Sequence, residues 1–137
     1  MTFNLIQGDL FNSKEGYFAH CISTDYNMSK GIAVDFDKKF KLRSRLKDYR
    51  GILIGDVILI DNVFNLITKK YYYNKPNYFS LEKSLRNMKT RCITNNVKVL
   101  NMPKIGCGLD KLNWNKVEEM IKDIFSDLDI TINVYYI

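Results

Sequence analysis

The stretch VKVLNMPKIGCGLD, Val97–Asp110, carries the strongest fold signal in this sequence of 137 residues. It opens with a run of β-forming residues, Val97–Met102, passes through a loop with two glycines, and leads into a helix predicted to begin after Asn113. A strand, a loop and a helix in this order make up the repeating unit of α/β proteins. Ligands of such proteins bind beyond the carboxyl ends of the strands, so we expect the chemistry of this chain in loops of this kind.

The rest of the chain alternates between strand-like and helix-like patterns. Five further strands are predicted, at Phe3–Ile6, Tyr17–Ile22, Asp56–Ile60, Val63–Thr68 and Thr131–Tyr136. Apolar residues at helical spacing predict three helices. The first covers Ile32–Tyr49, with Ala33, Phe36 and Phe40 facing inward, and the second covers Leu81–Cys92. The third begins after Asn113, and its apolar stripe consists of Val117, Met120, Ile121, Ile124 and Leu128.

The short connection between two of these strands indicates whether they pair in a parallel or an antiparallel manner. Asp61-Asn62 fits a tight hairpin turn, so part of the sheet is predicted to be antiparallel. The order of the elements predicts helices on both faces of that sheet. We therefore predict the α/β class, with residues 1–137 forming a single domain, a three-layer α/β/α sandwich with a mixed central sheet.

The amino-acid composition argues against a membrane protein and against a metal-binding protein. Apolar residues make up 46% of the chain and charged residues 26%, which is typical of globular proteins. No stretch reaches the roughly 18–20 apolar residues of a membrane span, and Met1–Leu10 lacks a leader pattern. We expect no membrane association, and a cytoplasmic location or a nuclear one in a eukaryote. Three widely spaced cysteines and one histidine predict neither a metal site nor a cofactor.

The net charge of +6 favours anionic partners such as phosphates, nucleotides or nucleic acid. Part of the excess lies in Lys38–Lys47, which is either a solvated helix face or a weak attraction for a polyanion. Two loops are candidates for holding an anion, because glycines let backbone N–H groups turn toward a phosphate at a helix start. The first is Lys104–Asp110, where a tight turn would also explain the glycines. The second is Asn27–Ala33, whose simpler interpretation is a connection capped by Ser29.

Several single residues also suggest chemistry. Asp9 could accept a hydrogen bond from a base amine, or simply cap a turn, which the sequence alone favours. Lys69 and Lys70 follow a strand, and their side chains are expected to point to opposite faces of the sheet. One of them could therefore reach a site and act as a nucleophile. The commoner case is a lysine at the end of a strand that is simply solvated. Neighbouring strand residues cannot form a dyad, which excludes His20 with Cys21. One weaker hypothesis is a thiolate–imidazole pair formed by His20 and Cys107. Another is that nucleobases stack on Tyr71-Tyr72-Tyr73, although the simpler explanation of these tyrosines is that they border the core.

Four segments of the sequence together resemble a macrodomain: Gly8-Asp9-Leu10-Phe11, Ala19-His20-Cys21-Ile22-Ser23, Gly31-Ile32-Ala33-Val34 and Pro103–Asp110. The chain is more narrowly similar to the terminal ADP-ribose protein glycohydrolase branch, through Leu66–Lys70, Lys75-Pro76 with Tyr78, and Ile132–Tyr135. The resemblance covers nearly the whole chain in the same order. It departs from the branch at Ser29 and Lys30, where small residues are usual, and by a small length difference near Tyr17.

This resemblance implies an ADP-ribose pocket with Lys69 as the nucleophile and Asp110 as the acid–base carboxylate. It implies further substrate-binding residues: Asp9 and Leu10 at the adenine beside Ile137, Ser23 at the distal ribose, and Ser29, Lys30, Gly31, Ile32, Ala33, Lys104, Ile105, Gly106, Cys107, Gly108 and Leu109 around the diphosphate. The implied activity is hydrolytic removal of mono- or terminal ADP-ribose from acidic protein side chains or DNA bases. The expected partners are ADP-ribose and the modified protein or DNA, and we expect a monomer.

Three other functions fit the same residues. A binding module would read ADP-ribose without cleaving it, and a phosphatase would act on ADP-ribose 1''-phosphate in the same pocket. Nucleic-acid binding rests on the positive charge and on Lys38–Lys47, and it is compatible with hydrolysis if the acceptor is DNA.

Overall fold

The computed structural model describes all residues from Met1 to Ile137 and contains one six-stranded sheet between two helical layers. The elements follow the chain as β1 (Thr2–Gln7), the short 3-10 helix η1 (Leu10–Asn12), β2 (Tyr17–Ser23), α1 (Ile32–Phe40), α2 (Leu42–Leu46), β3 (Val57–Ile60), β4 (Val63–Lys69), α3 (Tyr78–Thr94), β5 (Val99–Pro103), α4 (Trp114–Phe125) and β6 (Thr131–Tyr136). None of the helices combines the length and apolarity that crossing a bilayer requires.

The sheet has the strand order β1-β6-β5-β2-β4-β3. Every pair of neighbours is parallel except β3 with β4, which form a hairpin around Asp61, a residue with a φ of 49°. The predicted mixed sheet and its hairpin are therefore confirmed. Because β2, β4 and β5 are parallel neighbours, their carboxyl ends at Ser23, Lys69 and Pro103 meet at one edge of the sheet.

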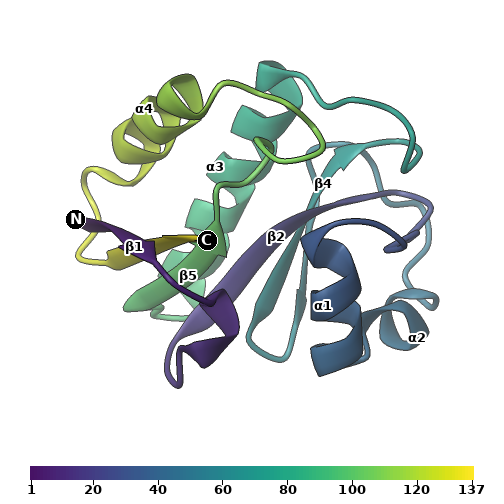
Figure 1. Cartoon of the computed structure of the whole chain (residues 1–137), viewed down its shortest axis with the longest axis horizontal. Helices are drawn as coiled ribbons and strands as arrows, with labels where there is room; N and C mark the ends of the chain where they lie inside the picture. Colours follow the sequence, from purple (N-terminus) through teal and green to yellow (C-terminus); the bar gives the residue numbers. More distant parts are fainter.

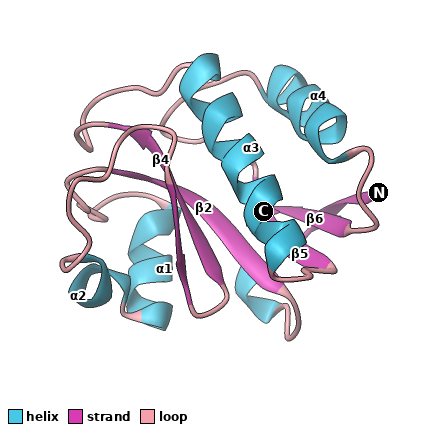
Figure 2. Cartoon of the chain, turned by 180° about the vertical axis from the view of Figure 1, so that it is seen from behind, coloured by secondary structure: helices cyan, strands magenta, loops and turns pink.

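The two faces of the sheet are covered by different helices, as the sequence predicted. Figure 1 shows α1 and α2 in front of the sheet, and Figure 2, seen from behind, shows α3 and α4 in front of it. On the α3 and α4 side a large core is formed by residues such as Leu85, Met88 and Ile121. On the opposite side Phe36 of α1 and Leu42 of α2 pack with η1 in a smaller core. This arrangement is a three-layer α/β/α sandwich.

The prediction of one continuous helix over Ile32–Tyr49 is wrong. Lys41 adopts a left-handed conformation with a φ of 54° and separates α1 from α2, while the Asp37 carboxylate accepts a hydrogen bond of 2.9 Å from the backbone N–H of Arg43. In an unbroken helix Leu42 would lie about 120° around the axis from the buried Phe36. The break lets both side chains reach the same core, where each is fully buried.

The other two helices lie where their apolar spacing predicts. The side chain of Asn113 caps α4 by accepting a hydrogen bond from the backbone N–H of Lys116, which confirms its predicted role. Asn77 and Ser80 form a capping box at the start of α3. The α4 stripe is shorter than predicted, because the helix ends at Phe125 and Leu128 lies beyond it, half-buried against the core.

Candidate functional site

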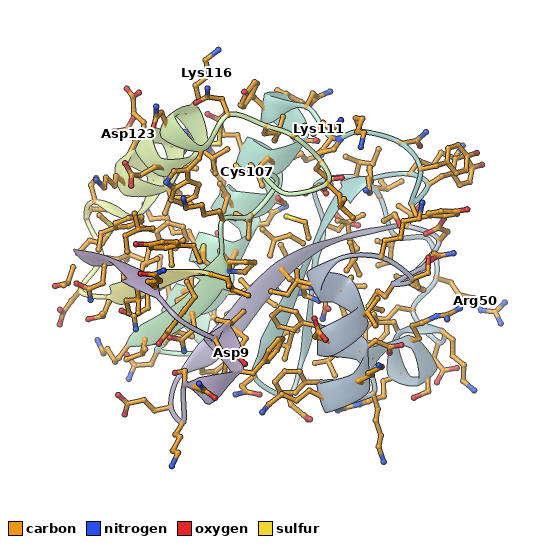
Figure 3. The ribbon with its side chains drawn as sticks, in the orientation of Figure 1. Asp9, Arg50, Cys107, Lys111, Lys116 and Asp123 are labelled. Atoms are coloured by element: carbon orange, nitrogen blue, oxygen red, sulfur yellow. The ribbon has the colours of Figure 1, made fainter.

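A cavity of about 1090 Å³ lies at the edge where the parallel strands end. Its walls come from the ends of β2, β4 and β6, from the loop and helix start at Asn27–Ala33, and from the loop Pro103–Leu112. Figure 3 shows Cys107 and Lys111 on this second loop, which crosses above the strand ends. The cavity therefore sits where the topology of an open α/β sheet places ligands.

An ion pair inside the cavity connects the end of β4 to the loop Pro103–Leu112. Lys69, the last residue of β4, donates from Nζ to Oδ1 of Asp110 across 2.7 Å. The two side chains are 15% and 16% exposed, so water screens the pair only in part. Both residues line the cavity, whereas Lys70 is exposed and places its ammonium 5.3 Å from the ring centre of Tyr71. Only Lys69 of the two neighbouring lysines faces the site.

The two glycine-containing loops face each other across the cavity. Gly31 has a φ of 63° and a ψ of −153°, a conformation that favours glycine, and a Cβ placed there would lie 3.2 Å from Cδ1 of Leu109. Gly31 is also the N-cap of α1 and supplies no side-chain cap, so the first N–H groups of the helix are available to a ligand. Gly106, with a φ of 72°, turns the opposite loop in the same way. Together these loops form a cradle suited to an anion.

The charge of the lining favours the same class of ligand. The cavity is lined by five lysines and one acidic side chain: Lys30, Lys69, Lys75, Lys104, Lys111 and Asp110. Lys104 places its ammonium 4.8 Å from the ring centre of Tyr136 and 5.7 Å from that of Trp114. Lys75 donates to the backbone carbonyl of Leu109 across 2.6 Å and so connects this loop to the segment that precedes α3. A polyanionic small molecule fits these surroundings.

Asp25 fastens the chain that follows β2 to the chain that follows β4. Its carboxylate accepts hydrogen bonds from the Ser23 hydroxyl and from the backbone N–H groups of Asn27 and Tyr72, the latter two at 3.0 Å. Burial alone would raise the pKa of Asp25, but these donors together lower it below the usual value. Thr24 adds a second tie, since its hydroxyl donates to the Lys70 carbonyl across 2.6 Å. The end of β4 is thereby fixed beside the end of β2.

His20 does not pair with Cys107, so that hypothesis is wrong. The His20 ring is fully buried, stacks on Phe36 at 4.0 Å between ring centres and contacts the Asn65 side-chain oxygen through Nε2 at 2.6 Å. Cys107 instead packs against the core on the other face of the sheet, and its thiol donates to the Ile105 carbonyl. Burial raises the pKa of Cys107 to about 11, so its thiol is a poor nucleophile.

Most residues predicted for the site line this one cavity: Ser23, Ser29, Lys30, Gly31, Ile32, Ala33, Lys69, Lys104, Ile105, Gly106, Cys107, Gly108, Leu109, Asp110 and Ile137. Asp9 and Leu10 are not among the residues that line it. Asp9 caps η1 by accepting the backbone N–H of Phe11 at 2.9 Å, while Leu10 is buried in the smaller core. Figure 3 shows Asp9 well away from Cys107 and Lys111. The adenine-binding role of these two residues stays a prediction.

Aromatic residues form part of the lining. Trp114, Tyr135 and Tyr136 line the cavity although they were not predicted for the site, and Tyr72 and Tyr73, for which base stacking was only the weaker hypothesis, line it as well. The tyrosines were expected to border a core, but Tyr71, Tyr72 and Tyr73 are 40%, 40% and 66% exposed, and that interpretation is wrong. Their position directly after the end of a strand is the signal that could have placed them at the site.

The amino-acid sequence is similar to that of a known protein. The sequence is 44% identical over 135 residues to the Homo sapiens protein named ADP-ribose glycohydrolase OARD1. The alignment covers 95% of this chain and 88% of that protein. No family model matches the sequence.

Two solved structures have a similar fold. The macrodomain of Thermus aquaticus DarG superimposes with a TM-score of 0.89 at 21% identity and covers 99% of both chains. Thermosipho africanus DarTG, solved in complex with ADP-ribose, gives a TM-score of 0.81 at 22% identity over 96% of this chain and 41% of that one. At these identities the likeness is one of fold.

Proposed function

The chain belongs to the macrodomain family, and from this premise we propose that it is an ADP-ribosyl glycohydrolase that binds ADP-ribose and removes it from modified acceptors. The name of the human relative supports the reaction, and the Thermosipho africanus complex supports the ligand. The observation that carries the proposal is the ion pair of Lys69 with Asp110, with 2.7 Å between Nζ and Oδ1 inside a cavity of nucleotide size.

The diphosphate of ADP-ribose would lie between the loops of Gly31 and Gly106. Free N–H groups at the start of α1 would donate to its oxygens, and the surrounding lysines would balance its charge. The adenine would extend toward Ile137 and the predicted contacts at Asp9 and Leu10. The distal ribose would then sit above the strand ends, within reach of Ser23 and the ion pair.

Lys69 would act as the nucleophile. Its ammonium first transfers a proton to Asp110, and the neutral amine attacks the anomeric carbon of the distal ribose. The bond from that carbon to the acceptor breaks, and its electron pair leaves with the acceptor. An acidic side chain leaves as a carboxylate, whereas a base nitrogen takes up the proton held by Asp110 as it leaves. Water then attacks the same carbon, the carbon–nitrogen bond breaks with its electron pair returning to nitrogen, and the amine takes up a proton from the attacking water. With an acidic acceptor, Asp110 finally gives its proton to the solvent. Free ADP-ribose is released and the ion pair forms again.

The acceptor would be a protein carboxylate or a DNA base, and the test uses both conjugates. Lys69→Ala should lower the rate of ADP-ribose release at least about a hundredfold, the lower end of what one group that transfers a proton contributes. Lys70→Ala is the matched control with the glutamate conjugate, because Lys70 is the exposed neighbour and does not line the cavity. The ribose ring of the lysyl adduct can open at its ring oxygen to give a Schiff base. Reduction of this Schiff base with cyanoborohydride during turnover should therefore trap ADP-ribose on the wild-type chain but not on Lys69→Ala.

Two outcomes would contradict the proposal. Equal turnover by wild type and Lys69→Ala would remove the lysine from the mechanism. Tight binding of ADP-ribose without release from either conjugate would leave a binding module in place of an enzyme.

A further inference from the structure

Two side chains at the start of α3 contact the loop that carries Asp110. Lys75 donates from Nζ to the backbone carbonyl of Leu109 across 2.6 Å. The hydroxyl of Tyr78, the first residue of α3, accepts the backbone N–H of Asn113 at 3.0 Å. We call Lys75 and Tyr78 the loop clamp. Its contacts lie on both sides of Asp110 in the chain, and neither residue takes part in the proposed cleavage.

Few hydrogen bonds join this loop to the rest of the protein. From residue 106 to residue 112, the partners outside the loop are Lys69, which binds the Asp110 carboxylate, and Lys75. The remaining hydrogen bonds of these residues close turns within the loop. Leu109 is 57% exposed, so packing does not hold this part of the loop in place. The position of the Asp110 backbone therefore depends on the loop clamp.

The loop clamp has a rigid base. Pro76, whose ring fixes its φ, is buried directly after Lys75. Asn77 and Ser80 form the capping box of α3, in which the Asn77 side-chain oxygen accepts the backbone N–H of Ser80 at 2.7 Å. Tyr78 packs against the large core. The loop clamp therefore relates the position of the loop to that of α3, which the core fixes.

The ammonium of Lys75 suits this task, because a hydrogen bond from a charged donor is stronger than one between neutral groups. The carbonyl of Leu109 belongs to the peptide unit that continues into Asp110, and a peptide unit is planar. Holding this carbonyl therefore restricts the position of the next Cα. The Asp110 carboxylate must stay beside Nζ of Lys69, at its present 2.7 Å, to take up the proton in the proposed cleavage.

We propose that Lys75 and Tyr78 are positioning residues, which keep the Asp110 carboxylate beside Lys69 during the chemical step. The effect on the rate rests on the proposed function, whereas the effect on the loop does not. Lys75 also lines the cavity, so a contact with the diphosphate is the competing role. Loss of a diphosphate contact would weaken ADP-ribose binding, whereas loss of a positioning contact lowers the rate of the bound substrate.

The test compares wild type with Lys75→Met, which keeps an unbranched side chain but has no donor. Release of ADP-ribose from the glutamate conjugate in a single turnover at saturating enzyme should slow about tenfold, as expected for one lost hydrogen bond from a charged donor. The Kd of ADP-ribose in calorimetry should change less than about threefold, because water screens the charge of this exposed lysine. Lys75→Arg restores a charged donor and should bring the rate back to within about twofold of wild type.

Two more variants complete the test. Lys70→Met is the matched control and should keep the wild-type rate, because it makes the same chemical change in the connection between β4 and α3 but Lys70 does not line the cavity. Tyr78→Phe removes only the hydroxyl that accepts the Asn113 N–H, and it should slow release about threefold, the effect of one neutral hydrogen bond. Hydrogen exchange across residues 106–113 should be faster in Lys75→Met and Tyr78→Phe but unchanged across residues 81–94 of α3.

Three results would overturn the inference. The first is an equal rate in wild type and Lys75→Met, and the second is a slower rate that Lys75→Arg does not restore. The third is weaker ADP-ribose binding with an unchanged rate, which would assign Lys75 to the diphosphate. Hydrogen exchange needs no substrate, so unchanged exchange across residues 106–113 in Lys75→Met would refute the loop clamp even if the wild type were inactive. A wild type that cleaves no conjugate, with faster exchange in that variant, would refute only the proposed function.

Discussion

The single histidine should make the folded protein sensitive to mild acid. Burial lowers the pKa of His20 from 6.5 to about 4, with the hydrogen bond to Asn65 and the charge of Asp37 opposing the shift. Below pH 6.5 the unfolded chain therefore binds a proton that the folded chain refuses, so the free energy of unfolding falls as pH falls. The two pKa values give a loss of about 2 kcal/mol at pH 5 and about 3 kcal/mol at pH 4.

This loss can be measured by urea unfolding between pH 7 and pH 4 and by thermal melting over the same range. A loss of 2 kcal/mol corresponds to about 8 °C in melting temperature for a chain of this length. Since the chain has one histidine, the proton NMR signals of its imidazole report the folded-state pKa without assignment ambiguity. The titration should have its midpoint near pH 4.

His20→Gln supplies the control, because a glutamine amide can still donate to Asn65 but does not titrate. Its absolute stability should fall through the lost contact with Phe36. The difference between pH 7 and pH 5 should nevertheless shrink by about 2 kcal/mol. An imidazole midpoint near 6.5, or an unchanged pH dependence in His20→Gln, would refute the reasoning from burial.

Two further predictions concern the loops. Gly31→Ala should lower the free energy of unfolding by about 1–3 kcal/mol and weaken ADP-ribose binding in calorimetry, because it strains the backbone and crowds Leu109. Gly108→Ala, whose new Cβ would meet no atom within 4 Å, should stay within about 0.5 kcal/mol of wild type, and equal losses in both variants would count against the strain. Asp25→Ala should cost about 1 kcal/mol and speed hydrogen exchange at the Tyr72 amide, and unchanged exchange there would show that the tie is dispensable.

Most of the fold could be predicted from the sequence because the apolar spacing is regular where elements pack. The stripe at Val117, Ile121 and Ile124 lies on one face of α4 as predicted. The break at Lys41 could not be predicted, since neither glycine nor proline marks it and lysine rarely adopts a left-handed conformation. Only the need to bury both Phe36 and Leu42, a tertiary effect, explains it.

The candidate site was predicted unevenly, for physical reasons. The glycine loops could be found because a positive φ at Gly31 and Gly106 requires a particular residue type. The partnership of Lys69 with Asp110 has no local signal, since 41 positions separate them, and it came from the family resemblance. Tyr73 was misplaced because an aromatic residue after an apolar strand has the same composition whether it continues the core or leaves it.

The strand order determines how the two members of the ion pair come together. β2 lies between β4 and β5, and it pairs with β5 only at Tyr17 and Phe18, whereas Lys69 lies beside Ser23 at the other end of β2. The carboxylate of Asp110 therefore comes from the loop that follows β5 and not from the strand itself. The sheet thus sets the position of the amine, and the length and turns of one loop set the position of its acidic partner.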